Sequence, residues 1–166
     1  MIQHTFIDYP HPEKDAVIYY MSGCQHNCLN CHSPELQEFE RYSRPIMDTI
    51  DLLSKALQKY KTNNLVISGG DCLHPYNLQL TKCLCNWFKK IQYINICLYT
   101  GFDIEYIEKC GIVNFDFIKG GKYIEKLKQK SEKTDEYIQF ASKNQFLIDT
   151  NKNVISKNGR YVFPKN

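Results

Sequence analysis

Four short apolar runs, each ending at glycine, most constrain the fold of this chain. The runs cover residues 16–23, 64–70, 94–101 and 114–121. A strand that stops at glycine is typical of a sheet whose loops begin at the carboxyl ends of the strands. Between the runs, apolar residues recur at three- and four-residue spacings, which predicts helices over residues 44–61, 75–90 and 102–110. This alternation favours an α/β fold built on a mostly parallel sheet.

The end of the chain has a different pattern. Residues 145–163 contain short strand-like runs broken by "TNKN" and "KNGR", which predicts a terminal β meander. The 166 residues suit one compact domain, and no internal repeat or linker divides them. We therefore expect a single domain over residues 1–166, with a core at about 16–150 and a C-terminal β extension at 151–166.

The expected compartment follows from what the chain lacks. Its first residues have neither the basic start nor the apolar stretch of a signal peptide, and no apolar run approaches the ~18 residues of a membrane helix. We therefore expect a cytoplasmic protein without membrane contact. In a reducing cytosol, the eight cysteines would serve metal binding, redox chemistry or burial rather than disulfides.

The net charge of +3 says little about partners. The basic stretch "KLKQKSEK" at residues 126–133 interleaves Ser and Glu with its lysines and contains no aromatic residue. This pattern favours a solvated helix face or loop over direct binding to nucleic acid.

Three cysteines, Cys24, Cys28 and Cys31, form a C-x3-C-x2-C motif in "SGCQHNCLNCHSPELQ", directly after the first predicted strand. Ligands of α/β proteins gather beyond the carboxyl ends of the strands, so the motif lies where a site is expected. Three thiolates can hold a cubane iron–sulfur cluster and leave one iron open. A structural zinc site with His26 or His32 as fourth ligand remains an alternative, as does a redox-active pair formed by the last two cysteines.

A second motif, "ISGGDCLHP", follows the second predicted strand. Gly69 and Gly70 expose backbone groups that can approach a polar ligand closely, and Asp71 adds an acceptor for an ammonium group. On its own, the motif also fits a tight strand-to-helix turn in which Asp71 caps the next helix. The open iron site expected at the neighbouring strand end favours the ligand-binding interpretation.

Together, "SGCQHNCLNCHSPEL" and "SGGDCLHPYN" resemble motifs of the radical S-adenosylmethionine superfamily and, within it, of the family of activating proteins of anaerobic (class III) ribonucleotide reductases. The segments "YTGF", "FDFIKGGKYIEKLK" and "ASKNQFLID" are similar to further parts of that family, so the resemblance covers roughly residues 16–150. The chain departs from the family pattern at Asn30, Ser33, Cys72, Ala141 and Phe146. None of these positions is one of the three cysteines.

The resemblance implies a short partial (β/α) barrel of mostly parallel strands, a [4Fe–4S] cluster and S-adenosylmethionine bound at its open iron. The cluster ligands would be Cys24, Cys28 and Cys31. The residues implied in cofactor binding are Ser68, Gly69, Gly70 and Asp71 on the methionine side, Asn30 and His32 near the adenine, and Tyr99 and Thr100 in the adjoining wall.

The resemblance also implies an activity. An electron delivered to the cluster would cleave S-adenosylmethionine to a 5′-deoxyadenosyl radical, which would take a hydrogen atom from a glycine on the large catalytic subunit of anaerobic ribonucleotide reductase. The electron would come from a reductant such as flavodoxin or ferredoxin. No catalytic side chain is expected beyond the cluster ligands, because the cofactor supplies the chemistry.

Two alternatives to this activity remain. One is a radical enzyme that acts on another glycyl-radical enzyme or on a small molecule. The other is a non-catalytic zinc or iron–sulfur binding module.

Overall fold

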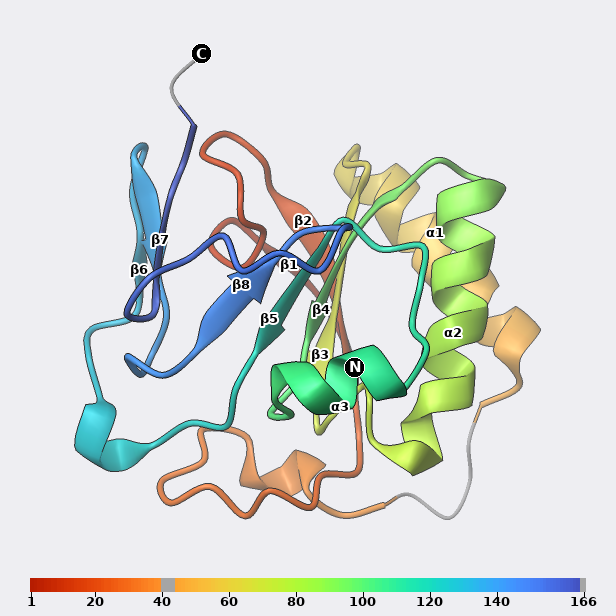
Figure 1. Cartoon of the computed structure of the whole chain (residues 1–166). Helices are drawn as coiled ribbons and strands as arrows, with labels where there is room; N and C mark the ends of the chain where they lie inside the picture. The colour runs from red at the N-terminus through yellow and green to blue at the C-terminus, as the bar shows by residue number, and fades with distance from the viewer. Residues whose placement is uncertain (40–43, 165–166) are drawn as a thin grey trace.

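A six-stranded sheet forms the centre of the protein in the computed structural model, which describes residues 1–39 and 44–164 (Figure 1). The strand order is β1-β2-β3-β4-β5-β8, and the four inner strands run parallel to one another. The outer strands β1 and β8 pair antiparallel with their neighbours, so the predicted mostly parallel sheet is confirmed. The strands are β1 (Ile2–Thr5), β2 (Ala16–Met21), β3 (Asn64–Gly69), β4 (Asn95–Tyr99), β5 (Phe117–Gly120) and β8 (Phe146–Ile148).

The three helices lie within the ranges that the apolar spacing predicts. They are α1 (Ile46–Tyr60), α2 (Pro75–Lys90) and α3 (Ile104–Lys109). The His74 ring caps α2 by accepting from the Tyr76 N–H at 3.1 Å. Asp103 caps α3 by accepting from the Tyr106 N–H at 2.9 Å. The caps lie in the turns that follow β3 and β4, so each cap fixes where a helix begins after its strand.

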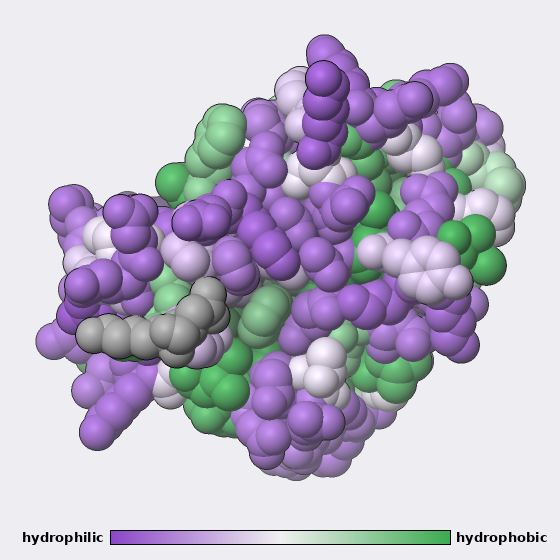
Figure 2. All heavy atoms as spheres, turned by 90° about the horizontal axis from the view of Figure 1, so that it is seen from above, coloured by the Kyte–Doolittle hydropathy of each residue, from purple (hydrophilic) through white to green (hydrophobic). Residues whose placement is uncertain are grey.

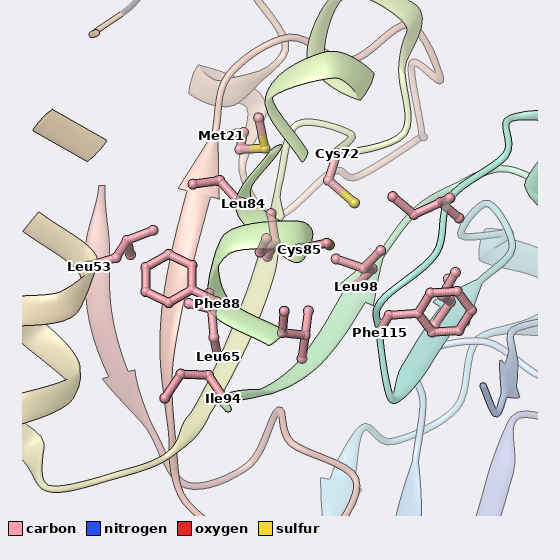
Figure 3. Close-up of a cluster of buried hydrophobic side chains, with 14 of the residues drawn as sticks. Met21, Leu53, Leu65, Cys72, Leu84, Cys85, Phe88, Ile94, Leu98 and Phe115 are labelled. Atoms are coloured by element: carbon pink, nitrogen blue, oxygen red, sulfur yellow. The ribbon is translucent and has the colours of Figure 1, made fainter. Parts of the chain in front are cut away.

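All three helices pack on one face of the sheet. Figure 3 shows Leu53 of α1, together with Leu84 and Phe88 of α2, pointing toward Leu65 of β3, and all four side chains are buried. Ile107 brings α3 into the same cluster. Burial of this shared apolar surface is the main stabilisation of such an arrangement, because each helix has little stability alone.

The opposite face of the sheet is covered by the segment that joins β1 to β2. Tyr9 and Ala16 pack there against Ile18, Val66 and Cys97, which come from β2, β3 and β4. The parallel strands are therefore buried on both faces, which explains why their sequences are continuous apolar runs rather than alternating ones.

A second, smaller sheet corrects the expectation of a terminal meander. It consists of β6 (Glu132–Lys133), β7 (Tyr137–Gln139) and β9 (Arg160–Val162), all paired antiparallel. The tail strands thus enter different sheets, since β8 joins the large sheet and β9 joins the small one. Phe140, Leu147 and Phe163 pack into one buried cluster, which holds the small sheet against the large one. The expected β extension supplies one strand, β9, to a sheet that begins earlier in the chain.

Among the residues that the structure describes, no helix is long and apolar enough to cross a membrane. The face seen in Figure 2 is mainly hydrophilic, with small hydrophobic areas between the polar side chains.

Candidate functional site

The cysteine motif lies on a loop that leaves β2 and folds back on a short 3-10 helix, η1 (Pro34–Leu36). The Gly23 N–H donates to the Leu36 carbonyl at 2.8 Å, and the Cys24 N–H donates to the Gln37 carbonyl at 3.0 Å. Gly23 has φ +93°, a conformation that glycine adopts without steric cost. These contacts fix the point at which the loop leaves the sheet, and with it the position of the first cysteine.

Cys24, Cys28 and Cys31 are free thiols, each half-buried on this loop. Burial raises the pKa of the first two, while backbone N–H groups of His26 and Tyr123 donate to their sulfur atoms and oppose that rise. No three His, Cys, Asp or Glu side chains in the described part of the chain lie close enough together to hold a metal ion. The structure therefore places the three thiols on one loop without gathering them around one point.

The donor set fits an iron–sulfur cluster by its chemistry. Thiolate sulfur is the ligand that such clusters take, and N–H donors to sulfur stabilise the charged form of a thiol. His26, one candidate for a fourth zinc ligand, directs its ring nitrogen to Asp71. His32, the other candidate, is exposed. The loop therefore offers three thiolates, a ligand set that can hold a cluster and leave one iron open.

Asp71 lies at the centre of a buried hydrogen-bond network behind the loop, and it has 0% of its surface exposed. Its Oδ2 accepts from the His26 Nε2 at 2.6 Å and from the Gly101 N–H at 2.7 Å. Its Oδ1 accepts from the Thr100 hydroxyl at 2.8 Å and from the Leu73 N–H at 2.9 Å. The network joins the cysteine loop, the turn after β3 and the turn after β4.

Gly69 and Gly70 allow two backbone segments to pack against each other. A Cβ at Gly70 would lie 2.4 Å from the Gly23 carbonyl oxygen, and one at Gly69 would lie 2.4 Å from the Met21 carbonyl oxygen. The Gly70 N–H donates to the Met21 carbonyl at 2.8 Å, and the Asp71 N–H donates to the Gly23 carbonyl at 2.9 Å. The glycine pair thus seats the turn after β3 against the root of the cysteine loop.

The predicted residues Ser68 and Tyr99 lie on their strands rather than in the network. Ser68 stands opposite Tyr20 in the pairing of β3 with β2. The Tyr99 hydroxyl donates to the Asp8 carbonyl at 2.6 Å, and its ring packs with the cluster on the face of the sheet away from the helices. Tyr99 is therefore held by the N-terminal segment.

Asn30 and His32, the two residues expected near an adenine, are exposed on the far part of the loop. Asn30 has φ +57°, which asparagine tolerates better than most residues. The structure thus brings Thr100 and Asp71 together behind the loop, whereas Asn30 and His32 lie outside that network.

A cleft of about 670 Å³ opens beside the network, beyond the carboxyl ends of β4 and β5. Its walls come from the cysteine loop, the turns after these two strands and the start of β8. The lining residues are Gln25, His26, Gly101, Phe102, Asp103, Gly121, Lys122, Asn144 and Phe146. The combination of aromatic faces with amide and ammonium groups suits a ligand that has a flat ring and polar substituents.

Phe102, Lys122 and Asn144 were not among the predicted site residues, and His26 was considered only as a zinc ligand. All four belong to segments already compared with the family, since His26 stands in "SGCQHNCLNCHSPEL", Phe102 in "YTGF", Lys122 in "GGKY" and Asn144 in "ASKNQ". Each lies just beyond a strand end or, for Asn144, just before β8. Only the strand order shows that these turns face one another.

A larger hollow of about 1030 Å³ lies between α1, α2 and β2, with Ile46, Ala56, Tyr19 and Leu80 in its walls. The Asp71 network and the cysteine loop border the smaller cleft instead. Because Gln25 and His26 of the cysteine loop and Gly101 of the Asp71 network line the smaller cleft, that cleft is the better candidate site.

One family model and two curated relatives match this chain. A family model described as a 4Fe-4S single cluster domain matches residues 15–148. The anaerobic ribonucleoside-triphosphate reductase-activating protein of Enterobacteria phage T4 is 29% identical over 116 residues, which cover 69% of this chain and 74% of that protein. The protein of the same name from Vibrio cholerae serotype O1 is 27% identical over 113 residues, which cover 64% of this chain and 72% of the relative. No solved structure matches.

Proposed function

This chain belongs to the family of 4Fe-4S single cluster domains, and from that premise we propose that it is an iron–sulfur activating protein of an anaerobic ribonucleotide reductase. The names of the two relatives support the target, and the family match supports the cluster. The observation that carries the proposal is a loop with three free thiols beside an open cleft. Such a loop can hold a cluster while a second ligand occupies the neighbouring space.

Cys24, Cys28 and Cys31 would hold the cluster and leave one iron without a protein ligand. The bond from His26 to Asp71 holds the loop that carries these cysteines against the turn after β3. S-adenosylmethionine would bind the open iron through its amino and carboxylate groups. When bound, the cluster would supply the one-electron chemistry for reductive cleavage of S-adenosylmethionine to a 5′-deoxyadenosyl radical, and through it the glycyl radical of the reductase.

The adenosyl part of the cofactor would occupy the cleft, where the rings of Phe102 and Phe146 offer apolar faces. On the methionine side, backbone carbonyls around Ser68, Gly69 and Gly70 would accept from the ammonium group. Asp71 already accepts four donors, so we propose that it positions these segments. The placements of Asn30 and His32 near the adenine, and of Tyr99 and Thr100 in the wall, stay predictions.

The remaining expectations complete the proposal. The parallel strands would form a short partial barrel within a single domain of 166 residues. The partner would be the large catalytic subunit of the reductase, and the electron would come from a flavodoxin or a ferredoxin in the cytoplasm.

Anaerobic reconstitution tests this function. The protein is loaded with iron and sulfide, reduced with dithionite and mixed with S-adenosylmethionine, and 5′-deoxyadenosine is then measured. Cys24→Ala, Cys28→Ala and Cys31→Ala should each abolish its formation. The matched control Cys83→Ala, which changes a half-buried thiol on α2, should leave it unchanged. A wild-type protein that binds zinc in place of the cluster and forms no 5′-deoxyadenosine would contradict the proposal.

A further inference from the structure

The positive charge of this protein is concentrated on two neighbouring segments beside the cysteine loop. Residues 122–130 and 141–145 carry five lysines and one glutamate, a net charge of +4, whereas the whole chain has +3 and the rest therefore −1. All five lysines are exposed. We name this region the lysine surface, and its lysines are Lys122, Lys126, Lys128, Lys130 and Lys143.

Hydrogen bonds hold the two segments of the lysine surface together. The Lys143 N–H donates to the Leu127 carbonyl at 2.9 Å, within the 3-10 helix η2 (Glu125–Leu127). The Asn144 side chain donates to the Lys122 carbonyl at 2.8 Å. Charges far apart in the sequence are therefore fixed on one surface, where they add up to a local positive potential.

The lysine surface lies beside the cysteine loop. Lys122 and Asn144 line the same cleft as Gln25 and His26 of that loop. Leu29 on the loop is 69% exposed, and Ile124 on the lysine surface is 40% exposed. The outside of the cysteine loop is thus a place where a partner would meet positive charge and exposed apolar side chains together.

We propose that the lysine surface docks an acidic one-electron carrier protein that reduces the cluster. This inference rests on the proposed function, in which each cleavage of S-adenosylmethionine consumes one electron from a separate reductant. The carrier loses that electron and the cluster gains it, and no atom is transferred. Opposite charge favours an acidic carrier, because electrostatic attraction accelerates encounter and orients the partner.

The position of the surface favours an electron carrier over the reductase. A target glycine has to enter the cleft lined by His26, Phe102 and Phe146. An electron only has to reach the cluster, and of the five lysines of this surface Lys122 alone lines the cleft. A carrier docked on the other four would leave the cleft open to the reductase.

Charge reversal in the reconstituted protein tests the docking surface. The variant Lys126→Glu/Lys143→Glu changes two exposed lysines, and the matched control Lys59→Glu/Lys90→Glu changes two exposed lysines at the ends of α1 and α2. The rate of cluster reduction by a reduced, acidic flavodoxin is measured at low and high salt, with dithionite as a small reductant in parallel. At low salt we expect the surface variant to be about tenfold slower with flavodoxin, and the control to change less than about twofold.

The outcomes separate this inference from the proposed function. Formation of 5′-deoxyadenosine with dithionite tests the function alone, and it should be the same in wild type and both variants. Unchanged flavodoxin rates in the surface variant, or equal losses in the control, would overturn the docking surface. If the surface variant lost as much rate with dithionite as with flavodoxin, the substitutions would have damaged the cluster itself, and the docking surface would be overturned. The docking surface would also be overturned by a surface variant that flavodoxin reduces normally but that no longer activates the reductase, because the surface would then belong to that partner.

Discussion

The His26 Nε2 lies 2.6 Å from the Asp71 Oδ2, and this bond ties the cysteine loop to the turn after β3. The two residues are 45 positions apart in the sequence. The side chain of Asp71 is fully buried and that of His26 is 13% exposed, so solvent competes little for the contact. The His26 ring also meets Phe102 edge-on, with 4.7 Å between the ring centroids. The imidazole is thus held between the network and the wall of the cleft.

Replacement of His26 should loosen the loop before any cluster is bound. His26→Ala removes one donor from a buried carboxylate, so we expect the free energy of unfolding of the metal-free protein to fall by about 1.5–3 kcal/mol. Urea denaturation measures this change. Hydrogen exchange of the loop amides should accelerate in the same variant.

His32→Ala is the matched control, since His32 is an exposed histidine on the same loop. We expect it to change the free energy of unfolding by less than about 0.5 kcal/mol. Equal effects of the two substitutions would show that the bond to Asp71 does not position the loop.

A side chain at Gly70 should displace the root of the loop. In Gly70→Ala the new Cβ would lie 2.4 Å from the Gly23 carbonyl oxygen, which is a backbone atom that cannot rotate away. We expect a destabilisation of about 1–3 kcal/mol and less iron bound per chain after reconstitution. Gly111→Ala is the comparison: it strains a residue with φ +64° but meets only the end of Lys82, at 3.6 Å. It should lower stability while leaving the iron content unchanged.

The main elements of the fold could be predicted because their causes are local. Apolar spacing sets α1, Pro75 starts α2, and glycine ends the run that contains β3. The destinations of β8 and β9 could not be predicted in this way. Three-residue strands such as these pair with whichever edge their buried side chains reach, and that choice depends on packing with Phe140 and Phe163.

The positions of the two site motifs could be predicted from the sequence, but the contacts between them could not. The spacing of the cysteines and the glycine pair are visible in sequence, because each motif lies on one continuous segment. The bond between His26 and Asp71 depends instead on two strands standing side by side, with Met21 opposite Gly69 in the pairing. The sequence predicted that Asp71 accepts from the ammonium group of a ligand. It did not show the four protein donors that already bond to the Asp71 carboxylate.

Alkylation should distinguish the loop thiols from the buried ones. Burial raises the pKa of Cys85 to about 12 and also raises that of Cys72 and Cys97, so these thiols carry almost no thiolate near pH 8. We expect iodoacetamide to leave all three unmodified in the native protein. Cys24, Cys28 and Cys31 should be protected while a cluster is bound and should react after a chelator removes it. Mass spectrometry of the digested protein measures each site, and a Cys97 that reacts as fast as the loop thiols would contradict the buried arrangement.

Lys119 should give the protein a stability that depends on pH. Its Nζ lies 4.6 Å from the Tyr99 ring centroid and 5.5 Å from that of Phe140. Burial lowers its pKa from 10.5 to about 8, although the nearby Asp8 and Cys97 oppose this shift. Below pH 8 the lysine is protonated in both states, so the folded protein bears the full cost of a buried charge. Between pH 8 and 10.5 the unfolded chain binds a proton that the folded chain has released, and the cost declines as pH rises.

Replacing Lys119 with methionine should therefore stabilise the protein most at neutral pH. For Lys119→Met we expect a gain of about 1–2 kcal/mol in the free energy of unfolding at pH 7, less than the pKa shift alone implies because the side chain is only half-buried. The gain should shrink steadily from pH 8 to pH 10. Cys97 and Tyr99 have raised pKa values, so the stability of wild type and variant alike falls as pH rises over this range. The quantity to compare is therefore the difference in the free energy of unfolding between variant and wild type at each pH. A gain for Lys119→Met that stays constant from pH 7 to pH 10 would show that its ammonium is not destabilised by burial.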